Sequence, residues 1–202
     1  TALSPEAFRN ETSQGAIILD TRTADAFEKG FVPGSVNIGL NGQFAVWVGT
    51  LIDISHRLVL VTEPGKERET VLRLARVGYE NVAGYLKGGV AAYDKKLETI
   101  HSVDERGVVS EIDAGAIVLD VRKQNEWNIS HLDGAIFLPL SEFPGNLGDL
   151  DRDAHYIVHC GGGYRSMTAI SIMKKMGFRN LINVYGGYGT LQKAGLECKV
   201  ES

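Results

Sequence analysis

The chain has 202 residues, enough for one large domain or two small ones. Its composition is 44% hydrophobic and 23% charged, which supports packed cores and excludes a chain that is disordered throughout. The net charge is −4 and no cluster of Lys and Arg stands out, so we expect no nucleic-acid partner.

Several features of the sequence bear on where the protein works. No apolar run is long enough to span a bilayer, so we expect no membrane partner. The first residues, TALSPEAF, lack the pattern of a secretory signal and lack Met, so we expect a processed chain or a piece of a longer one. Only Cys160 and Cys198 occur, which suits a reducing, cytoplasmic location better than a secreted disulfide framework.

Short apolar runs alternate with amphipathic stretches along the chain. The runs predicted as strands are, in order, AIILD (16–20), RLVLV (57–61), NVAGYL (81–86), AIVLD (116–120), HYIVH (155–159) and LINVY (181–185). The stretches with a helical pattern are TADAFEKG (23–30), ETVLRLARVG (69–78), KQNEWNIS (123–130) and SMTAISIMKKMG (166–177). This alternation predicts an α/β fold in which a mostly parallel sheet is flanked by helices.

The order of these elements occurs twice because the sequence repeats itself. GAIILDTR (15–22) and GAIVLDVR (115–122) differ at only two positions, and VGYENV (77–82) matches MGFRNL (176–181). A repeat of this length indicates two domains of ordinary size, not a solenoid of short units. We therefore predict two tandem domains of the same fold, residues 1–99 and residues 100–202.

Residues 159–166, HCGGGYRS, join a predicted strand to a predicted helix in the second copy. The start of a helix offers unpaired N–H groups and the positive end of the helix dipole, which together bind anions. A cysteine that faces such a site has its thiolate, the nucleophilic form, stabilised. Three consecutive glycines allow the loop to curl so that its N–H groups point at one centre. The pattern predicts a reactive cysteine in an anion-binding loop.

A lone cysteine is more often an inert core residue than a nucleophile. Here the strand end, the helix start, the glycines and an arginine converge on Cys160, which favours the reactive interpretation. Two enzyme classes use such a loop: one removes phosphate and the other transfers sulfur. A phosphate group needs a wider cradle than the four residues between Cys160 and Arg165 provide. We favour sulfur transfer, with a cysteine-dependent phosphatase as the less favoured alternative.

The second copy resembles the rhodanese family of sulfurtransferases over nearly all of residues 102–200. VLDVRKQNEWNISHLDGAIFL (118–138) resembles the family's first block, D-x-R followed by G-H-hydrophobic-P-G-A, with Ser130 in place of Gly and Asp133 in place of Pro. HCGGGYRS matches the active loop, C-x-x-x-x-R. NVYGGYGTLQKAG (183–195) resembles the terminal block, in which a glycine pair precedes a short helix.

The resemblance implies a reaction that needs no cofactor beyond a covalent cysteine persulfide. Cys160 would take a sulfane sulfur from thiosulfate or a low-molecular-weight persulfide and pass it to a thiol or to cyanide. Arg165 would hold the anionic end of the donor. The residues implied in substrate binding are Gly161, Gly162, Gly163, Tyr164, Arg165 and Ser166. Asp120 and Arg122 match the D-x-R motif, and we interpret them as an ion-paired brace that supports the active loop, 160–165.

The first copy keeps the framework of the family but lacks its chemistry. No cysteine occurs in residues 1–159. Direct alignment of VLVTE with YIVHC places Glu63 opposite the nucleophile and Arg68 opposite the loop arginine, and Pro64 removes an N–H group that an anion cradle needs. We predict a catalytically silent domain. We also hypothesise that the Glu63 carboxylate faces the helix N–H groups and fills the anion site.

TEPGKERE (62–69) and the segment after it resemble the silent copy of proteins that join a metallo-β-lactamase-fold domain to rhodanese domains. The resemblance implies a partner, fused or separate, with the fold of a persulfide dioxygenase. The five histidines of this chain lack the spacing of a metal site, so we predict no metal here. An alternative from another functional class is a non-catalytic sulfur-relay or docking module that serves such a dioxygenase.

Further residues near the loop are expected to be structural. Adjacent side chains of a strand point to opposite faces, so His159 should face away from Cys160. His131 is expected to pack or hydrogen-bond locally. Trp127, like Tyr164, is a candidate pocket wall, although aromatic residues more often belong to a core. Cys198 is expected to be an inert thiol and not a resolving one.

Overall fold

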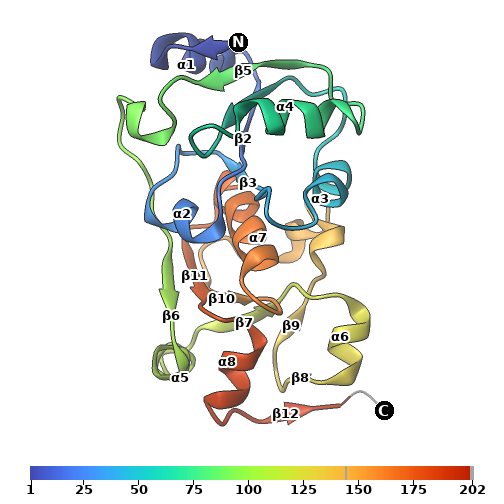
Figure 1. Ribbon diagram of the computed structural model, residues 1–202. Helices are drawn as coiled ribbons and strands as arrows, with labels where there is room; N and C mark the ends of the chain where they lie inside the picture. Colours follow the sequence, from blue (N-terminus) through green and yellow to red (C-terminus); the bar gives the residue numbers. More distant parts are fainter. Residues whose placement is uncertain (144, 201–202) are drawn as a thin grey trace. The chain divides into compact units, whose positions relative to one another are not determined.

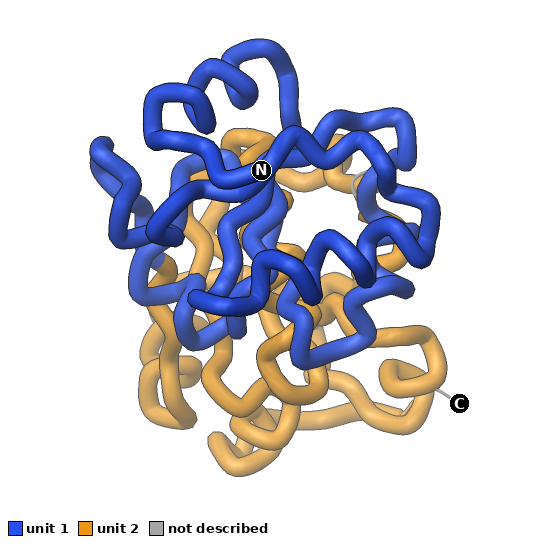
Figure 2. The backbone as a smooth tube through the Cα atoms, turned by 45° about the horizontal axis from the view of Figure 1, so that its top comes forward, with its two compact units in different colours: residues 1–99 blue, residues 100–202 orange. Residues whose placement is uncertain are grey.

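The computed structural model describes residues 1–143 and 145–200, which form two compact units, Thr1–Thr99 and Ile100–Ser202 (Figure 2). Each unit holds one five-stranded sheet in which every paired strand is parallel to its neighbour. The predicted α/β fold, with parallel sheets flanked by helices, is confirmed (Figure 1). We describe the two units separately.

In unit 1 the sheet has the strand order β1–β5–β4–β2–β3. The strands are β1 (Ala2–Leu3), β2 (Ile17–Asp20), β3 (Val36–Asn37), β4 (Leu58–Val61) and β5 (Val82–Leu86). The helices are α1 (Pro5–Ser13), α2 (Ala24–Lys29), α3 (Phe44–Leu51) and α4 (Glu67–Ala75), followed by the short 3₁₀ helix η1 (Val90–Ala92). The sequence patterns had singled out the three central strands and the segments of α2 and α4.

In unit 2 the sheet has the equivalent strand order, β6–β11–β10–β7–β9. The strands are β6 (His101–Val103), β7 (Ile117–Asp120), β9 (Ile136–Phe137), β10 (His155–His159) and β11 (Asn180–Val184). A separate antiparallel pair consists of β8 (His131–Leu132) and β12 (Cys198–Lys199). The helices are α5 (Glu105–Asp113), α6 (Gln124–Ile129), α7 (Tyr164–Lys175) and α8 (Tyr188–Lys193), with 3₁₀ helices η2 (Leu140–Glu142) and η3 (Leu147–Asp149).

Local sequence explains why the elements start and end where they do. All four residues of β4, LVLV, are buried, as expected for a strand in the middle of a parallel sheet. Ser4 caps α1 by accepting a hydrogen bond from the Ala7 N–H, and Asp104 caps α5 by accepting from Gly107. Because the strands of each five-stranded sheet are parallel, their carboxyl ends lie at one edge of the sheet. Ligands of α/β proteins usually bind at this edge.

Each unit packs its own apolar core against its sheet. In unit 1 the buried cluster consists of Phe8, Ala16, Ile18, Val32, Val59, Val61 and Leu86. In unit 2 it consists of Val103, Val108, Ala116, Val118, Leu132, Ile157, Ile182, Val184, Tyr188 and Leu191. Among residues 1–143 and 145–200, no helix is both long enough and apolar enough to cross a bilayer.

Candidate active site

Cys160 directly follows β10, the strand between β7 and β11 in the sheet of unit 2. The cysteine is buried, with 1% of its surface exposed, while Gly161 and Gly162 are exposed beside it. The chain then enters α7 at Tyr164, so the sulfur lies between a strand end and a helix start. This is the position that the sequence pattern predicts for the candidate nucleophile.

The Cys160 sulfur is held by groups from the first turn of α7. The Gly163 N–H donates to Sγ at 3.1 Å, and the thiol donates to Ser166 Oγ at 3.6 Å. Gly163 has φ of +98°, a left-handed conformation that side chains disfavour, so a glycine suits the turn that aims this N–H at the sulfur. The loop therefore offers hydrogen bonding to a thiolate at Cys160.

Ser166 is itself fixed by a buried residue that the sequence did not single out. Its hydroxyl donates to Asn183 Oδ1 at 2.8 Å, and Asn183 Nδ2 donates to Ser102 Oγ at 3.0 Å. Asn183 lies in β11, where it interrupts the apolar run LINVY and is only 4% exposed. A buried polar residue in an apolar strand usually has a bonding role, and this was the signal available in the sequence.

The glycine pair of the terminal block lies against the backbone of Cys160. The Tyr188 N–H donates to the Cys160 carbonyl at 2.7 Å. A Cβ atom on Gly187 would lie 2.4 Å from the same carbonyl oxygen, closer than any side chain permits. Gly187 therefore allows two loops to meet and fixes the peptide that follows the cysteine.

Asp120 and Arg122 form a buried ion pair below the loop. The Arg122 Nη2 donates to Asp120 Oδ2 at 2.6 Å and to the Ser130 carbonyl at 2.8 Å, and its guanidinium lies 3.8 Å from the centre of the Tyr188 ring. Unit 1 has the same arrangement, in which Arg22 bonds Asp20 and the Gly30 carbonyl. The brace is thus common to both copies and does not distinguish the one with the cysteine.

Arg165 is paired with a carboxylate that the sequence interpretation missed. Its Nη1 and Nη2 donate to Glu126 Oε2 and Oε1 at 2.5 and 2.8 Å. The hydrogen bond from Arg165 lowers the pKa of Glu126, and the same bond raises the pKa of Arg165. Glu126 is in the first turn of α6, where it also accepts from the Lys123 N–H at 3.1 Å. Its place in the sequence indicates a helix cap and does not indicate the ion pair with Arg165.

His159 is fully buried next to Cys160. Its Nε2 lies 3.6 Å from Asp120 Oδ2, and neither ring nitrogen has a hydrogen-bond partner in the described part of the chain. Burial lowers the pKa of His159 from 6.5 to about 4, so the imidazole is neutral near pH 7.

The remaining predicted residues lie in local contacts. His131 stacks on Trp127 with ring centres 3.7 Å apart, and its Nδ1 is 3.0 Å from the Trp127 carbonyl. Cys198 is half-buried in β12 and lies 3.6 Å from the Leu196 carbonyl. Tyr164 is half-buried at the first position of α7. Across residues 1–143 and 145–200, no group of three or more His, Cys, Asp and Glu side chains could hold a metal ion.

The comparison with known families assigns both units to one family. The description "Rhodanese-like domain" matches residues 4–96 and again residues 107–194, which together make up most of the chain. The chain belongs to the rhodanese-like domain family. Its two units are therefore tandem rhodanese-like domains, and the loop at Cys160 belongs to the second domain.

Two curated relatives are named for sulfur chemistry. A probable adenylyltransferase/sulfurtransferase MoeZ of Mycobacterium tuberculosis (strain CDC 1551 / Oshkosh) is 28% identical over 141 residues, which cover 67% of this chain and 34% of that protein. A putative sulfur carrier protein YrkF of Bacillus subtilis (strain 168) is 26% identical over 137 residues, covering 62% of this chain and 74% of that protein. The rhodanese-like chain thus spans about a third of the length of the mycobacterial relative.

Solved structures of related proteins align with one domain or with both. A rhodanese-related protein from Thermoplasma volcanium is 30% identical with a TM-score of 0.46, covering 50% of this chain and 99% of that one. A thiosulfate sulfurtransferase from Pseudomonas aeruginosa is 18% identical with a TM-score of 0.44, covering 100% of this chain and 44% of that one.

The strand register corrects the alignment of the two rhodanese-like domains. Asp20 of β2 pairs with Val61, and the equivalent Asp120 of β7 pairs with His159. Val61 therefore corresponds to His159, and the next residue, Thr62, corresponds to Cys160. The prediction that placed Glu63 opposite Cys160 is wrong by one residue. The alignment is set by which residue pairs with the aspartate of the neighbouring strand, and not by the length of the apolar run.

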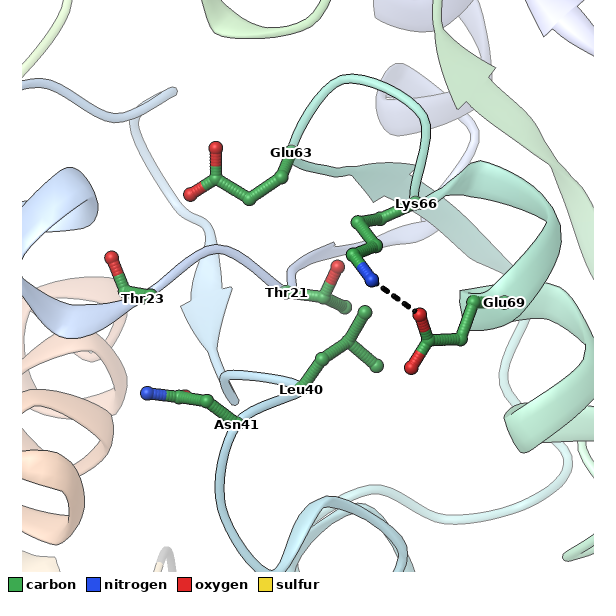
Figure 3. A pocket seen from close by; sticks show the side chains of 7 residues that line it. All are labelled: Thr21, Thr23, Leu40, Asn41, Glu63, Lys66 and Glu69. Carbon is green, nitrogen blue, oxygen red and sulfur yellow. Dashed lines mark hydrogen bonds and ion pairs between the residues drawn. The ribbon is translucent and has the colours of Figure 1, made fainter.

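The hypothesis that Glu63 fills the anion site of the first domain is also wrong. The Gly65 N–H at the start of α4 donates to Glu67 Oε1 at 3.3 Å, so a different carboxylate takes the loop N–H. Glu63 instead points away from the first turn of α4 and into an open pocket of about 200 Å³ (Figure 3). The other wall of the pocket carries Lys66, which donates to Glu69 at 2.8 Å. Arg68, the expected counterpart of the loop arginine, is exposed on α4.

Proposed function

We propose that this rhodanese-like chain is a sulfurtransferase that carries a sulfane sulfur on Cys160. The observation that carries the proposal is the hydrogen bond of 3.1 Å from the Gly163 N–H to Sγ, at the junction of β10 with α7. Such a junction stabilises a thiolate and a persulfide anion at the same place. The sulfurtransferase and sulfur-carrier names of the two curated relatives support the same class of chemistry.

The reaction has two displacement steps at sulfur. The Cys160 thiolate attacks the sulfane sulfur of thiosulfate or of a low-molecular-weight persulfide, and the S–S bond of the donor breaks. The donor leaves with the electron pair as sulfite or as a thiolate, and Cys160 becomes a persulfide anion. A thiolate or cyanide then attacks the terminal sulfur, and the Cys160 thiolate leaves with the electron pair. No electron acceptor or metal is required for this balance.

Sulfur loading of Cys160 is the direct test. After incubation with thiosulfate or glutathione persulfide, we expect the intact mass to rise by one sulfur atom and peptide mapping to place that atom on Cys160. Cys160→Ser should abolish loading and turnover, because the nucleophile is removed. Cys198→Ser is the matched control and should leave both nearly unchanged, since that thiol lies in β12, outside the loop 160–165, and Ser keeps a group that can donate to the Leu196 carbonyl. Equal losses from the two variants would refute the assignment.

A sulfur relay without independent turnover is the second candidate, favoured by the sulfur-carrier name of the Bacillus relative. In this case Cys160 would receive its sulfur from, or deliver it to, a protein such as a persulfide dioxygenase of metallo-β-lactamase fold, fused or separate. Stoichiometric loading of Cys160 without release to thiol or cyanide would favour the relay. Multiple turnovers with small-molecule donor and acceptor would favour the enzyme.

A further inference from the structure

We propose that Glu126 sets the donor specificity of the Cys160 site by disfavouring doubly charged thiosulfate relative to a persulfide. This inference rests on the proposed function and names the substrate class of that site. The feature that carries it is the two-point ion pair of Arg165 with Glu126, at 2.5 and 2.8 Å, beside the active loop.

The pair lies where a donor must approach. A Cβ atom on Gly161 would lie 3.0 Å from Arg165 Nη2 and 3.4 Å from Glu126 Oε1, so both charges flank the residue after the nucleophile. The side chains are 17% and 29% exposed, which places the pair at the rim of the loop and within reach of solvent. The hydrogen bond from Arg165 to Glu126 is the largest cause that raises the pKa of Arg165, so the guanidinium stays charged within the pair.

The ion pair changes the charge that a donor meets. An unpaired arginine would present one positive charge to the sulfonate end of thiosulfate. With Glu126 attached, the pair is neutral, and two of the five guanidinium N–H groups already bond the carboxylate. Thiosulfate brings two negative charges to the site, whereas the reacting end of a persulfide brings one. The Glu126 carboxylate therefore repels thiosulfate more strongly than it repels a persulfide. The N–H groups of the loop remain available to bind the single negative charge of the persulfide.

The first domain indicates that the fold itself does not require Glu126. Helix α2 (Ala24–Lys29) corresponds to α6 (Gln124–Ile129), and the position of Glu126 is occupied there by Ala26. The start of α2 is capped by Thr23, whose hydroxyl accepts from the Ala26 N–H at 3.3 Å. The Thr23 hydroxyl caps α2 without a carboxylate, whereas Glu126 takes part in the cap of α6. Of the two corresponding positions, the one with the carboxylate belongs to the domain that bears the cysteine.

The test compares two donors in the chain of 202 residues. We expect Glu126→Gln to raise the ratio of kcat/KM for thiosulfate to kcat/KM for glutathione persulfide by about tenfold, because one negative charge leaves the rim. Gln retains an oxygen that can accept from the Lys123 N–H. Glu111→Gln is the control, since Glu111 also faces a basic side chain, His155 at 3.6 Å, but at the opposite end of β10. It should leave the ratio unchanged.

A second variant keeps the test decisive if Glu126→Gln does not fold. Lys123→Thr combined with Glu126→Ala copies the cap of α2 and should shift the ratio in the same direction. An unchanged or lower ratio in a folded variant, or equal loss of both donors, would overturn the proposal. Failure of the native protein to load sulfur on Cys160 from either donor would instead overturn the proposed function, so the two failures are distinguishable.

Discussion

At the scale of single residues, the two domains differ at two adjacent positions at the end of a central strand. The strand register aligns Val61 with His159 and Thr62 with Cys160. The buried Asp–Arg brace is the same in both domains, so it needs neither the histidine nor the cysteine. A buried imidazole without a hydrogen-bond partner lowers stability, and in the described part of the chain His159, beside the candidate nucleophile, is the side chain in this state.

His159 should make the second domain sensitive to acid. Its pKa in the folded protein, about 4, lies below its ordinary value of 6.5, so the unfolded chain takes up a proton that the buried ring does not. Stability is therefore retained above pH 6.5 and is lost as the pH falls toward 4. Between about pH 7.5 and 5 this group should lower the free energy of unfolding by about 2 kcal/mol.

The measurement is urea unfolding at several pH values, followed by the fluorescence of Trp127 in a Trp47→Phe background. His159→Val copies the residue found in the first domain and should remove this contribution to the pH dependence. His101→Val, at an exposed position of β6, should retain it. The same pH dependence in the protein with His159 and in His159→Val would contradict the assignment of acid sensitivity to this ring.

At the scale of elements, the two domains differ at the junction between a central strand and the next helix. In the second domain, the junction of β10 with α7 directs the Gly163 N–H at the sulfur. In the first domain, Pro64 lacks an N–H, the Gly65 N–H bonds Glu67, and Glu63 points into the pocket. The same fold thus yields a loop whose N–H bonds a cysteine sulfur in one copy and a pocket lined by Glu63 in the other.

A cysteine alone should not activate the first domain. We expect Thr62→Cys in a Cys160→Ser background to gain no sulfur from thiosulfate or glutathione persulfide. The Gly65 N–H, which corresponds to that of Gly163, already bonds Glu67, and the Glu63 carboxylate repels an anionic donor. Intact mass after incubation with each donor is the measurement. A sulfur adduct on the introduced thiol would contradict the prediction that this loop cannot support sulfur loading.

At the scale of the whole molecule, the hydrogen bonds given above for Cys160 and its neighbours join residues of the second unit. Ser166, Asn183 and Ser102 form one chain of hydrogen bonds, and Tyr188 and Glu126 complete the surroundings of the loop. The second unit also has its own five-stranded sheet and its own buried core. A domain with a separate core is expected to fold by itself.

Residues 100–202, produced alone, should therefore fold and accept sulfur on Cys160. Circular dichroism with thermal melting tests folding, and intact mass after incubation with glutathione persulfide tests loading. Residues 1–99 are the matched control, which should fold without loading. A fragment 100–202 that folds but does not load would show that the first domain contributes to the reaction.

Most of the fold, but only part of the candidate site, was predictable from the sequence. The strands of 155–159 and 116–120 are apolar runs, and the helix of 166–177 has a helical pattern that ends at a glycine. Helices α1 and α3 and the outer strands β1 and β3 were not singled out. The outer strands have only two residues each, too few for a periodic pattern to appear.

The sequence by itself determined the repeat, the central strands, the loop with Cys160 and the pairing of Asp120 with Arg122. These features depend on residues that are close along the chain or on a motif that occurs twice. The tertiary structure decided that Thr62, and not Glu63, corresponds to Cys160, that Arg165 pairs with Glu126 39 residues away, and that Asn183 holds Ser166. Strand register and contacts between distant elements follow from packing of the whole sheet, which local patterns do not specify.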